Sequence, residues 1–101
     1  MVFQPHRFTR TRDLMPDFID VLKTVDQLVL TEVYAASEQK IAGADGQSLF
    51  EAVKKAGAKE ACFVAQLSQL SDALQGILKP NDIVILQGAG NIVTMVDELL
   101  A

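Results

Sequence analysis

A strand-like run followed by a helix-like pattern occurs four times along the 101 residues of this chain. The apolar runs are Met1–Gln4, Gln27–Val33, Ala61–Ala65 and Asp82–Gln87, and the helical patterns are Leu14–Lys23, Ser48–Ala56, Gln69–Leu78 and Ile92–Leu100. Such alternation is typical of a parallel sheet with right-handed crossovers and helices on both faces. It predicts an α/β fold, a three-layer α/β/α arrangement with a mainly parallel, Rossmann-like sheet, in a single domain over 1–101.

Local signals refine these elements. Pro16 is compatible only with the first turn of a helix, so we expect Asp13 to be the N-cap, with at most one loose helical turn before it. The unbroken apolar run 83–86 indicates a strand covered on both faces. The connection from Tyr34 to Gly46 is longer than compact domains usually keep unless it has a function.

Charge and composition exclude several classes of protein. The net charge is −4 and half the residues are apolar, which indicates a globular domain and argues against nucleic-acid binding. No apolar run approaches the roughly 18–20 residues of a membrane span, so no membrane partner is expected. We expect no signal peptide before the first strand. A lone Cys62 in an apolar run predicts a buried, inert thiol, and we expect a cytoplasmic protein.

The segment from Gln4 to Arg12 holds the only histidine and all three arginines of the chain. A guanidinium group presents a planar fork of donors that matches carboxylate or phosphate oxygens. The cluster therefore favours an anion site. The alternative is a solvated turn whose arginines pair with Asp13 and Asp17. Arg7 and Arg10 are three residues apart and would share a helical face, with Arg12 pointing elsewhere.

Ligands of parallel sheets bind beyond the carboxyl ends of the strands. The turn at His6, the loop from Tyr34 and the turn Gly88–Asn91 should therefore lie along one rim. Gly88-Ala89-Gly90 is half of a dinucleotide fingerprint. It is either a turn that needs positive φ or a helix start whose N–H groups bind an anion or carbonyl. Tyr34 more often packs over a strand end than contacts substrate.

The chain lacks a complete set of catalytic groups. It has neither a P-loop nor a metal-ligand cluster, and His6 with the distant Cys62 cannot form a zinc site. Glu32, Glu38 and Asp45 either touch a cation or, as acids in a loop usually are, are solvated. No nucleophile–base pair is evident, so the chain supplies part of a site.

Four segments resemble the C-terminal domain of the Mur ligase family in order and spacing. They are Phe3–Asp13, Leu30–Glu38, Gly43–Asp45 and Gln87–Ile92. The first is typical of the branch that joins L-alanine to UDP-N-acetylmuramate in peptidoglycan biosynthesis. The resemblance implies an amide-forming ligase dependent on ATP and Mg, working through an acyl phosphate on the muramoyl carboxylate that the alanine amine attacks. The ATP-binding and UDP-sugar domains of the family are absent here, so this domain is expected to be inactive alone and to hold no cofactor tightly.

The resemblance also implies roles for individual residues. Arg7 and Arg10 would hold the L-alanine carboxylate, and His6 would be a catalytic residue beside them, facing the reacting phosphates. The border of the pocket would be formed by Tyr34, Gly88, Ala89, Gly90 and Asn91, and no residue is assigned to a metal. L-alanine offers little besides its carboxylate to hold, so charge-assisted bonds of about 1.5–3 kcal/mol each would orient it.

Departures from the family pattern leave alternatives open. Pro16 replaces an ordinary helix former and Ser37 a usual glycine. The family's domain begins one strand and one helix earlier, in a segment with an acidic-aromatic-histidine motif, which implies an exposed apolar sheet edge and self-association. The alternatives are the related ligase that recycles whole peptides, where paired arginines are not expected, and a stand-alone anion- or nucleotide-binding module of flavodoxin-like shape.

Overall fold

The sheet contains four short strands in a computed structural model that describes residues 1–79, 84–88 and 90–94, apart from the side chains of Asn91 and Val93. The strands are β1 (Val2–Phe3), β2 (Leu28–Thr31), β3 (Ala61–Val64) and β4 (Leu86–Gln87). The helices are α1 (Phe8–Asp13), α2 (Met15–Leu22), α3 (Gly46–Lys55) and α4 (Leu70–Gln75), and the 3-10 turns are η1 (Leu67–Gln69) and η2 (Asn91–Thr94).

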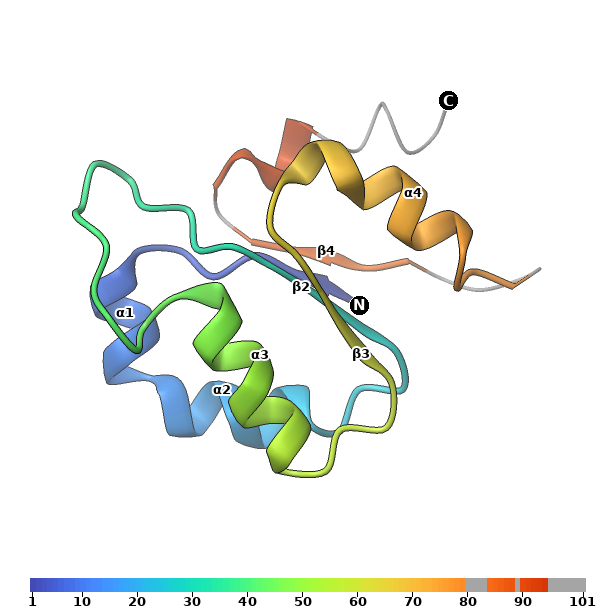
Figure 1. Cartoon of the computed structure of the whole chain (residues 1–101), viewed down its shortest axis with the longest axis horizontal. Coiled ribbons are helices and arrows are strands. Elements are labelled where there is room, and N and C mark those ends of the chain that lie inside the picture. The colour runs from blue at the N-terminus through green and yellow to red at the C-terminus, as the bar shows by residue number, and fades with distance from the viewer. Residues whose placement is uncertain (80–83, 89, 95–101) are drawn as a thin grey trace.

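The strand order is β3–β2–β1–β4, and each neighbouring pair is parallel (Figure 1). Val2 of β1 lies opposite Val29 on one side and Leu86 on the other. The predicted α/β fold with a parallel sheet is therefore confirmed. Because all four strands run the same way, the turns that follow them lie at one rim of the sheet.

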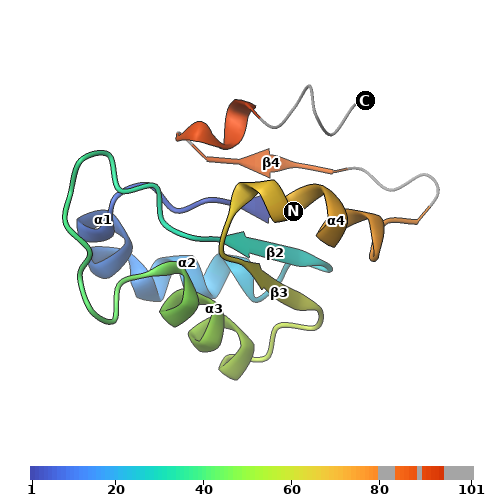
Figure 2. The ribbon, with the colours of Figure 1, turned by 45° about the horizontal axis from the view of Figure 1, so that its top comes forward.

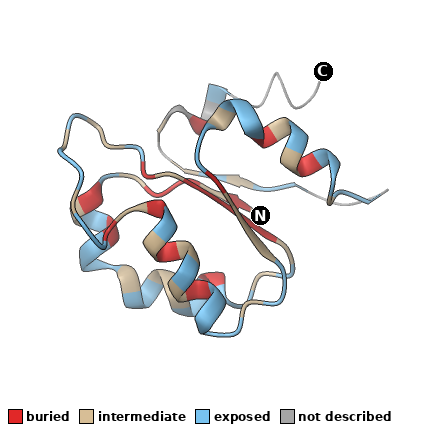
Figure 3. Ribbon diagram, viewed as in Figure 1, coloured by how far each residue is buried: buried red, intermediate tan, exposed pale blue. Residues whose placement is uncertain are grey.

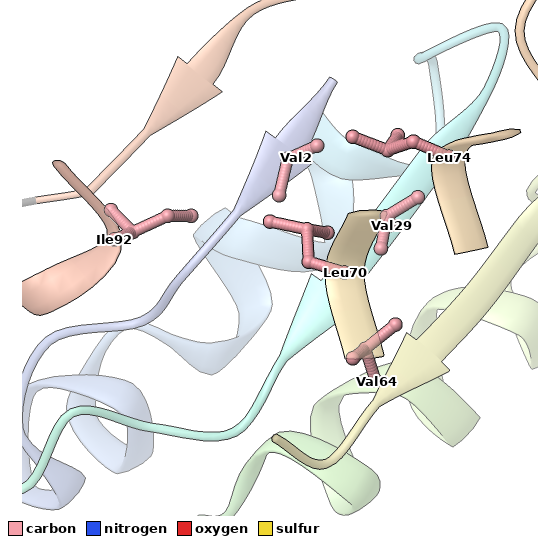
Figure 4. Close-up of a cluster of buried hydrophobic side chains, with 6 residues drawn as sticks. All are labelled: Val2, Val29, Val64, Leu70, Leu74 and Ile92. Atoms are coloured by element: carbon pink, nitrogen blue, oxygen red, sulfur yellow. The ribbon is translucent and has the colours of Figure 1, made fainter. Parts of the chain in front are cut away.

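Helices cover both faces, since alternate residues of a strand point to opposite sides. α2 and α3 pack on one face, and α4 with η2 on the other (Figure 2). Buried residues concentrate on the strands and the facing sides of the helices (Figure 3). Val29 belongs to the cluster Val2, Val29, Val64, Leu70, Leu74 and Ile92 (Figure 4). Its neighbours Leu28 and Leu30 face the other cluster, with Leu22, Leu49 and Val53.

The start of the first helical segment differs from the prediction. Residues 8–13 form a complete short helix instead of one loose turn, and Asp13 ends it instead of capping the next. Leu14 is the N-cap of α2 and makes no side-chain capping bond, while Pro16 lies in the first turn as predicted. Asp13 is the last residue of α1, and its carboxylate accepts a 2.9 Å bond from Arg12 Nε.

Other helix ends also shift. α3 begins at Gly46, two residues before the predicted Ser48, because Asp45 accepts a bond from the Ser48 amide. Gly57 follows α3 with φ +107°, a C-terminal position that favours glycine. α4 is shorter than the predicted helix and follows a 3-10 turn. The predicted last helix lies outside the described residues beyond Thr94.

The prediction that the fourth strand is covered on both faces is wrong for the residues described. Val84 is 37% exposed and Ile85 is 50% exposed. Within the described ranges, β4 lies at the edge of the four-stranded sheet and pairs with β1 alone. An apolar run therefore indicated a strand but not its position in the sheet. Across the described ranges, none of the helices combines the length and apolar character needed to span a membrane.

Candidate functional site

The turn after β1 and the loop after β2 are joined at the carboxyl rim. His6 and Tyr34 form an isolated parallel bridge. The Arg7 amide donates to the Tyr34 carbonyl at 2.7 Å, and the Tyr34 amide donates to the Pro5 carbonyl at 2.8 Å. Three segments were predicted to meet at one rim: the turn at His6, the loop from Tyr34 and the turn Gly88–Asn91. Backbone hydrogen bonds hold the first two together.

Gly88 and Gly90, from the turn after β4, lie at the same carboxyl rim. A Cβ on Gly90 would lie 2.5 Å from Tyr34 Cγ, and one on Gly88 would lie 2.9 Å from Ile92 Cγ2. The buried Gln4 carboxamide oxygen accepts a 3.1 Å bond from the Ile92 amide. The predicted convergence of the three signals on one rim is thus confirmed.

The glycines of this turn serve close packing. Gly88 does not have positive φ, so the predicted conformational reason is wrong there, and the contact with Ile92 explains the glycine instead. The Ile92 amide, which the anion-site interpretation would have left open, is bonded to Gln4. Ala89 lies outside the described residues, and so does the Asn91 side chain.

The arginine cluster divides into two kinds. Arg7 and Arg10 are exposed, and neither forms an ion pair with any residue in the described part of the chain. Arg12 instead pairs with the adjacent Asp13. An open depression of about 520 Å³ is lined by His6, Arg7, Thr9, Arg10, Asp13 and Leu14. The alternative in which Asp13 and Asp17 neutralise the cluster therefore holds only for Arg12.

Arg7 has an unusual backbone conformation, with φ 70° and ψ 138°. A side chain rarely adopts this region, which favours glycine. Bonds on both sides hold it: its amide donates to Tyr34, and its carbonyl accepts from the Thr11 amide at 3.1 Å and the Thr11 hydroxyl at 2.9 Å. Strain of this kind persists where the surroundings impose it, and such positions cluster at functional sites.

His6 lines the depression, and one of its two ring nitrogens is buried. Its imidazole stacks on the Tyr34 ring, with centroids 5.6 Å apart and planes at 19°. Nδ1 is buried and has no hydrogen-bond partner among the residues that the structure describes. Nε2 is therefore the nitrogen that a ligand could reach. Tyr34 packs its ring over the strand end, as its favoured interpretation predicted.

The three loop acids are not simply solvated, which corrects the favoured interpretation. The Glu38 carboxylate accepts from the Phe8 amide at 2.7 Å, the Thr9 amide at 3.2 Å and the Thr9 hydroxyl at 2.6 Å. The hydroxyl bond is the main reason that the pKa of Glu38 is lowered, with help from the two amides and the charge of Arg7. Because Glu38 is 29–30 residues from these donors, no local pattern could have revealed it.

The other two acids lie at the two ends of the same loop and accept from backbone amides there. Glu32 Oε1 accepts from the Val33 amide at 2.8 Å and from the Gly46 amide at 2.6 Å. Asp45 accepts from the Ser48 amide at 2.9 Å and pairs with Lys40 at 3.3 Å, and the bonds from Ser48 chiefly lower its pKa. An aspartate just before an apolar helical pattern is an N-cap signal, so the role of Asp45 could have been predicted.

The residues present do not fit a magnesium–nucleotide site. No group of three His, Cys, Asp or Glu side chains that could hold a metal occurs in the described part of the chain. The three loop acids are already used as acceptors for backbone amides. Cys62 is a free, half-buried thiol whose pKa is raised by burial, which agrees with an unreactive thiol. We therefore derive no step through ATP or Mg on this chain.

The family model described as "Mur ligase, glutamate ligase domain" matches residues 1–90, and the chain therefore belongs to that family. One relative is the UDP-N-acetylmuramate--L-alanine ligase of Coxiella burnetii, 51% identical over 100 residues, which make up 99% of this chain and 22% of that relative. Another, with the same name, is from Paraburkholderia xenovorans and is 53% identical over 92 residues, 91% of this chain and 20% of the relative. The chain thus spans about a fifth of the length of these relatives.

Proposed function

We propose that this chain is the amino-acid-binding C-terminal domain of a cytoplasmic, ATP-dependent ligase that joins L-alanine to UDP-N-acetylmuramate in peptidoglycan biosynthesis, and that it is inactive alone. One observation carries the proposal: Arg7 and Arg10 line one open depression and are not neutralised by an ion pair within the described residues. Unpaired guanidinium groups at a sheet rim are suited to an incoming carboxylate.

Each residue of the depression has a distinct role in this proposal. Arg7 and Arg10 bind the carboxylate of L-alanine and so orient its amine. His6, held by its stack on Tyr34, faces the reacting phosphate through Nε2. Tyr34 and the turn at Gly88–Asn91 form the border of the pocket. ATP, Mg and the UDP-sugar would be bound by parts of a full ligase that lie outside this chain.

The sequence is also compatible with two other functions, a peptide-recycling ligase and a stand-alone anion-binding module. The relatives at 51–53% identity are named as alanine-adding ligases, which favours that branch over the ligase that recycles peptides. A stand-alone anion-binding module would also bind a carboxylate weakly at these arginines. Calorimetry with L-alanine on the chain alone cannot separate these functions, whereas turnover in a complete ligase can.

A chimera provides that complete ligase. The matching 100 residues of the Coxiella burnetii relative are replaced by this chain, and alanine-dependent phosphate release is measured with UDP-N-acetylmuramate and ATP. Release that requires L-alanine supports the ligase. A chimera that folds and binds UDP-N-acetylmuramate but releases no phosphate with L-alanine would refute it.

Two variants of the chimera then test the arginine site. Arg7→Ala should raise the KM for L-alanine by about 10- to 100-fold, the equivalent of one lost charge-assisted contact, and leave the KM for UDP-N-acetylmuramate near wild type. Arg12→Ala is the matched control, because Arg12 pairs with Asp13 and does not line the depression. Equal alanine kinetics in the Arg7 variant and wild type would remove the role given to Arg7.

We also infer that copies of the isolated chain associate through the open edge of β4. The observation that supports this is the exposure of Val84 and Ile85 beside a strand that pairs on one side only. Exposed apolar strand edges are templates for pairing with another chain.

A further inference from the structure

We propose that Glu38 is a positioning residue for the arginine site, holding from the loop after β2 the turn that presents Arg7 and Arg10. The inference rests on the proposed function for its consequence in catalysis, but the contact itself is independent of which anion the arginines bind. Glu38 does not line the depression with Arg7 and Arg10. It acts on the arginines through the backbone that carries them.

α1 cannot cap its own N-terminus. Its N-cap residue is Arg7, which makes no side-chain capping bond, and its first turn contains no acidic residue. The first amides of a helix need acceptors from elsewhere. Glu38 supplies them, because one carboxylate oxygen accepts from the Phe8 and Thr9 amides and the other accepts from the Thr9 hydroxyl.

Hydrogen bonds to one loop hold the backbone both at Arg7 and at the two residues that follow it. The Arg7 amide is bonded to the loop at Tyr34, and the next two amides are bonded to the same loop at Glu38. The φ of 70° at Arg7 is therefore enclosed between two attachments to one segment. Without the second attachment, the peptide after Arg7 could rotate toward an ordinary conformation and carry both arginines away from the depression.

The loop itself is built to present Glu38. The Glu38 amide donates to the Ala35 carbonyl at 3.0 Å, and the two residues between them have positive φ, 51° at Ala36 and 74° at Ser37. Two central residues with positive φ define a tight turn that glycine or asparagine usually fills. The two ends of the loop are also joined, because Glu32 at its start accepts from the Gly46 amide at its end. This turn thus places the Glu38 carboxylate at the N-terminus of α1.

Asp45 provides a matched control. It is a carboxylate of the same loop that caps a helix, yet it caps α3, whose residues do not line the arginine depression. Glu38→Ala and Asp45→Ala each remove a cap, so both should lower the melting temperature. Only the first should disturb the arginine site.

Two measurements test the proposal. In the 101-residue chain, Glu38→Ala should speed hydrogen exchange of the Phe8 and Thr9 amides by at least about tenfold, while Asp45→Ala should not. In the chimera, Glu38→Ala should raise the KM for L-alanine by about tenfold with little change in the KM for UDP-N-acetylmuramate. Glu38→Gln should recover part of the loss, because its carbonyl oxygen can still accept from an amide.

Each result tests a separate part of the proposal. Unchanged exchange at Phe8 and Thr9 overturns the contact. Faster exchange with unchanged alanine KM overturns the positioning role, and so does an equal rise of the alanine KM in Asp45→Ala. Failure of the proposed function is distinguishable, because it appears as a folded chimera that binds UDP-N-acetylmuramate but releases no phosphate with L-alanine, while the exchange result for Glu38 in the 101-residue chain still stands.

Discussion

The strained backbone at Arg7 leads to a prediction about stability that is separate from ligand binding. Arg7→Gly should be more stable than Arg7→Ala, because alanine keeps the Cβ that opposes φ 70° and glycine does not. Strain in such a region costs about 1–3 kcal/mol. Glycine loses about 0.5–1 kcal/mol of this advantage through the greater freedom of the unfolded chain. The difference in unfolding free energy should therefore be up to about 2.5 kcal/mol in favour of glycine.

Arg12 gives the matched comparison with the opposite sign. It lies within α1, where Arg12→Gly should be less stable than Arg12→Ala by up to about 1 kcal/mol, because glycine is a poor helix former. Urea unfolding of the four variants, analysed by linear extrapolation, measures both differences. The same sign at both positions, with alanine the more stable residue at position 7 as well, would refute the inference that Arg7 is held under strain.

Binding separates the two effects of the Arg7 substitutions. Neither Arg7→Gly nor Arg7→Ala retains a guanidinium group, so in the chimera both should show the same rise in the KM for L-alanine despite their different stabilities. A natural arginine at a position where glycine would fold better is expected where function needs the side chain. If Arg7→Gly kept wild-type alanine kinetics, the strain would have no connection with the site.

Three further predictions concern packing, pH and association. Gly46→Ala should destabilise the chain by about 1–3 kcal/mol or more, because its Cβ would lie 2.6 Å from a carbonyl oxygen of β2. Gly76→Ala is the control, because the atom nearest to its Cβ would be 3.6 Å away, and it should be nearly neutral in thermal melting. The pKa of Glu38 is lowered in the folded chain, so the unfolded chain binds more protons just below the ordinary carboxyl pKa. The stabilisation by Glu38 should be complete above the ordinary glutamate pKa of about 4.3 and be lost as the pH falls through the lowered pKa of the folded chain, and Glu38→Gln should weaken that dependence in acid titrations. Ile85→Lys should reduce concentration-dependent sedimentation of the isolated chain, because a charged side chain blocks edge pairing.

Each of these has its own contrary result. Melting curves that coincide for Gly46→Ala and wild type would contradict the close approach of α3 to β2. An unchanged acid transition in Glu38→Gln would contradict the stabilising role of the carboxylate. For association, Val21→Lys is the control, since Val21 is 61% exposed on α2, away from the sheet edge. Equal effects of the two lysine substitutions would remove β4 as the interface.

The order of elements and the convergence of the candidate-site segments on one rim could be predicted from the sequence. Alternation of apolar runs and helical patterns depends on short-range periodicity, and it predicted the parallel sheet, the two helical layers and the rim at which His6, Tyr34 and Gly90 meet. The concentration of every arginine after the first strand indicated an anion site, and the structure leaves Arg7 and Arg10 available for that purpose.

Tertiary structure alone decided what each polar group does there. Whether Arg12 is neutralised depends on its pairing with Asp13, and whether Glu38 is solvated or a cap depends on a contact with residues 29–30 positions away. The exposure of Ile85 likewise follows from the place of β4 at the sheet edge. Periodicity encodes which side of an element is apolar, but hydrogen-bond partners far apart in the chain are fixed only when the backbone folds and brings them within about 3 Å of each other.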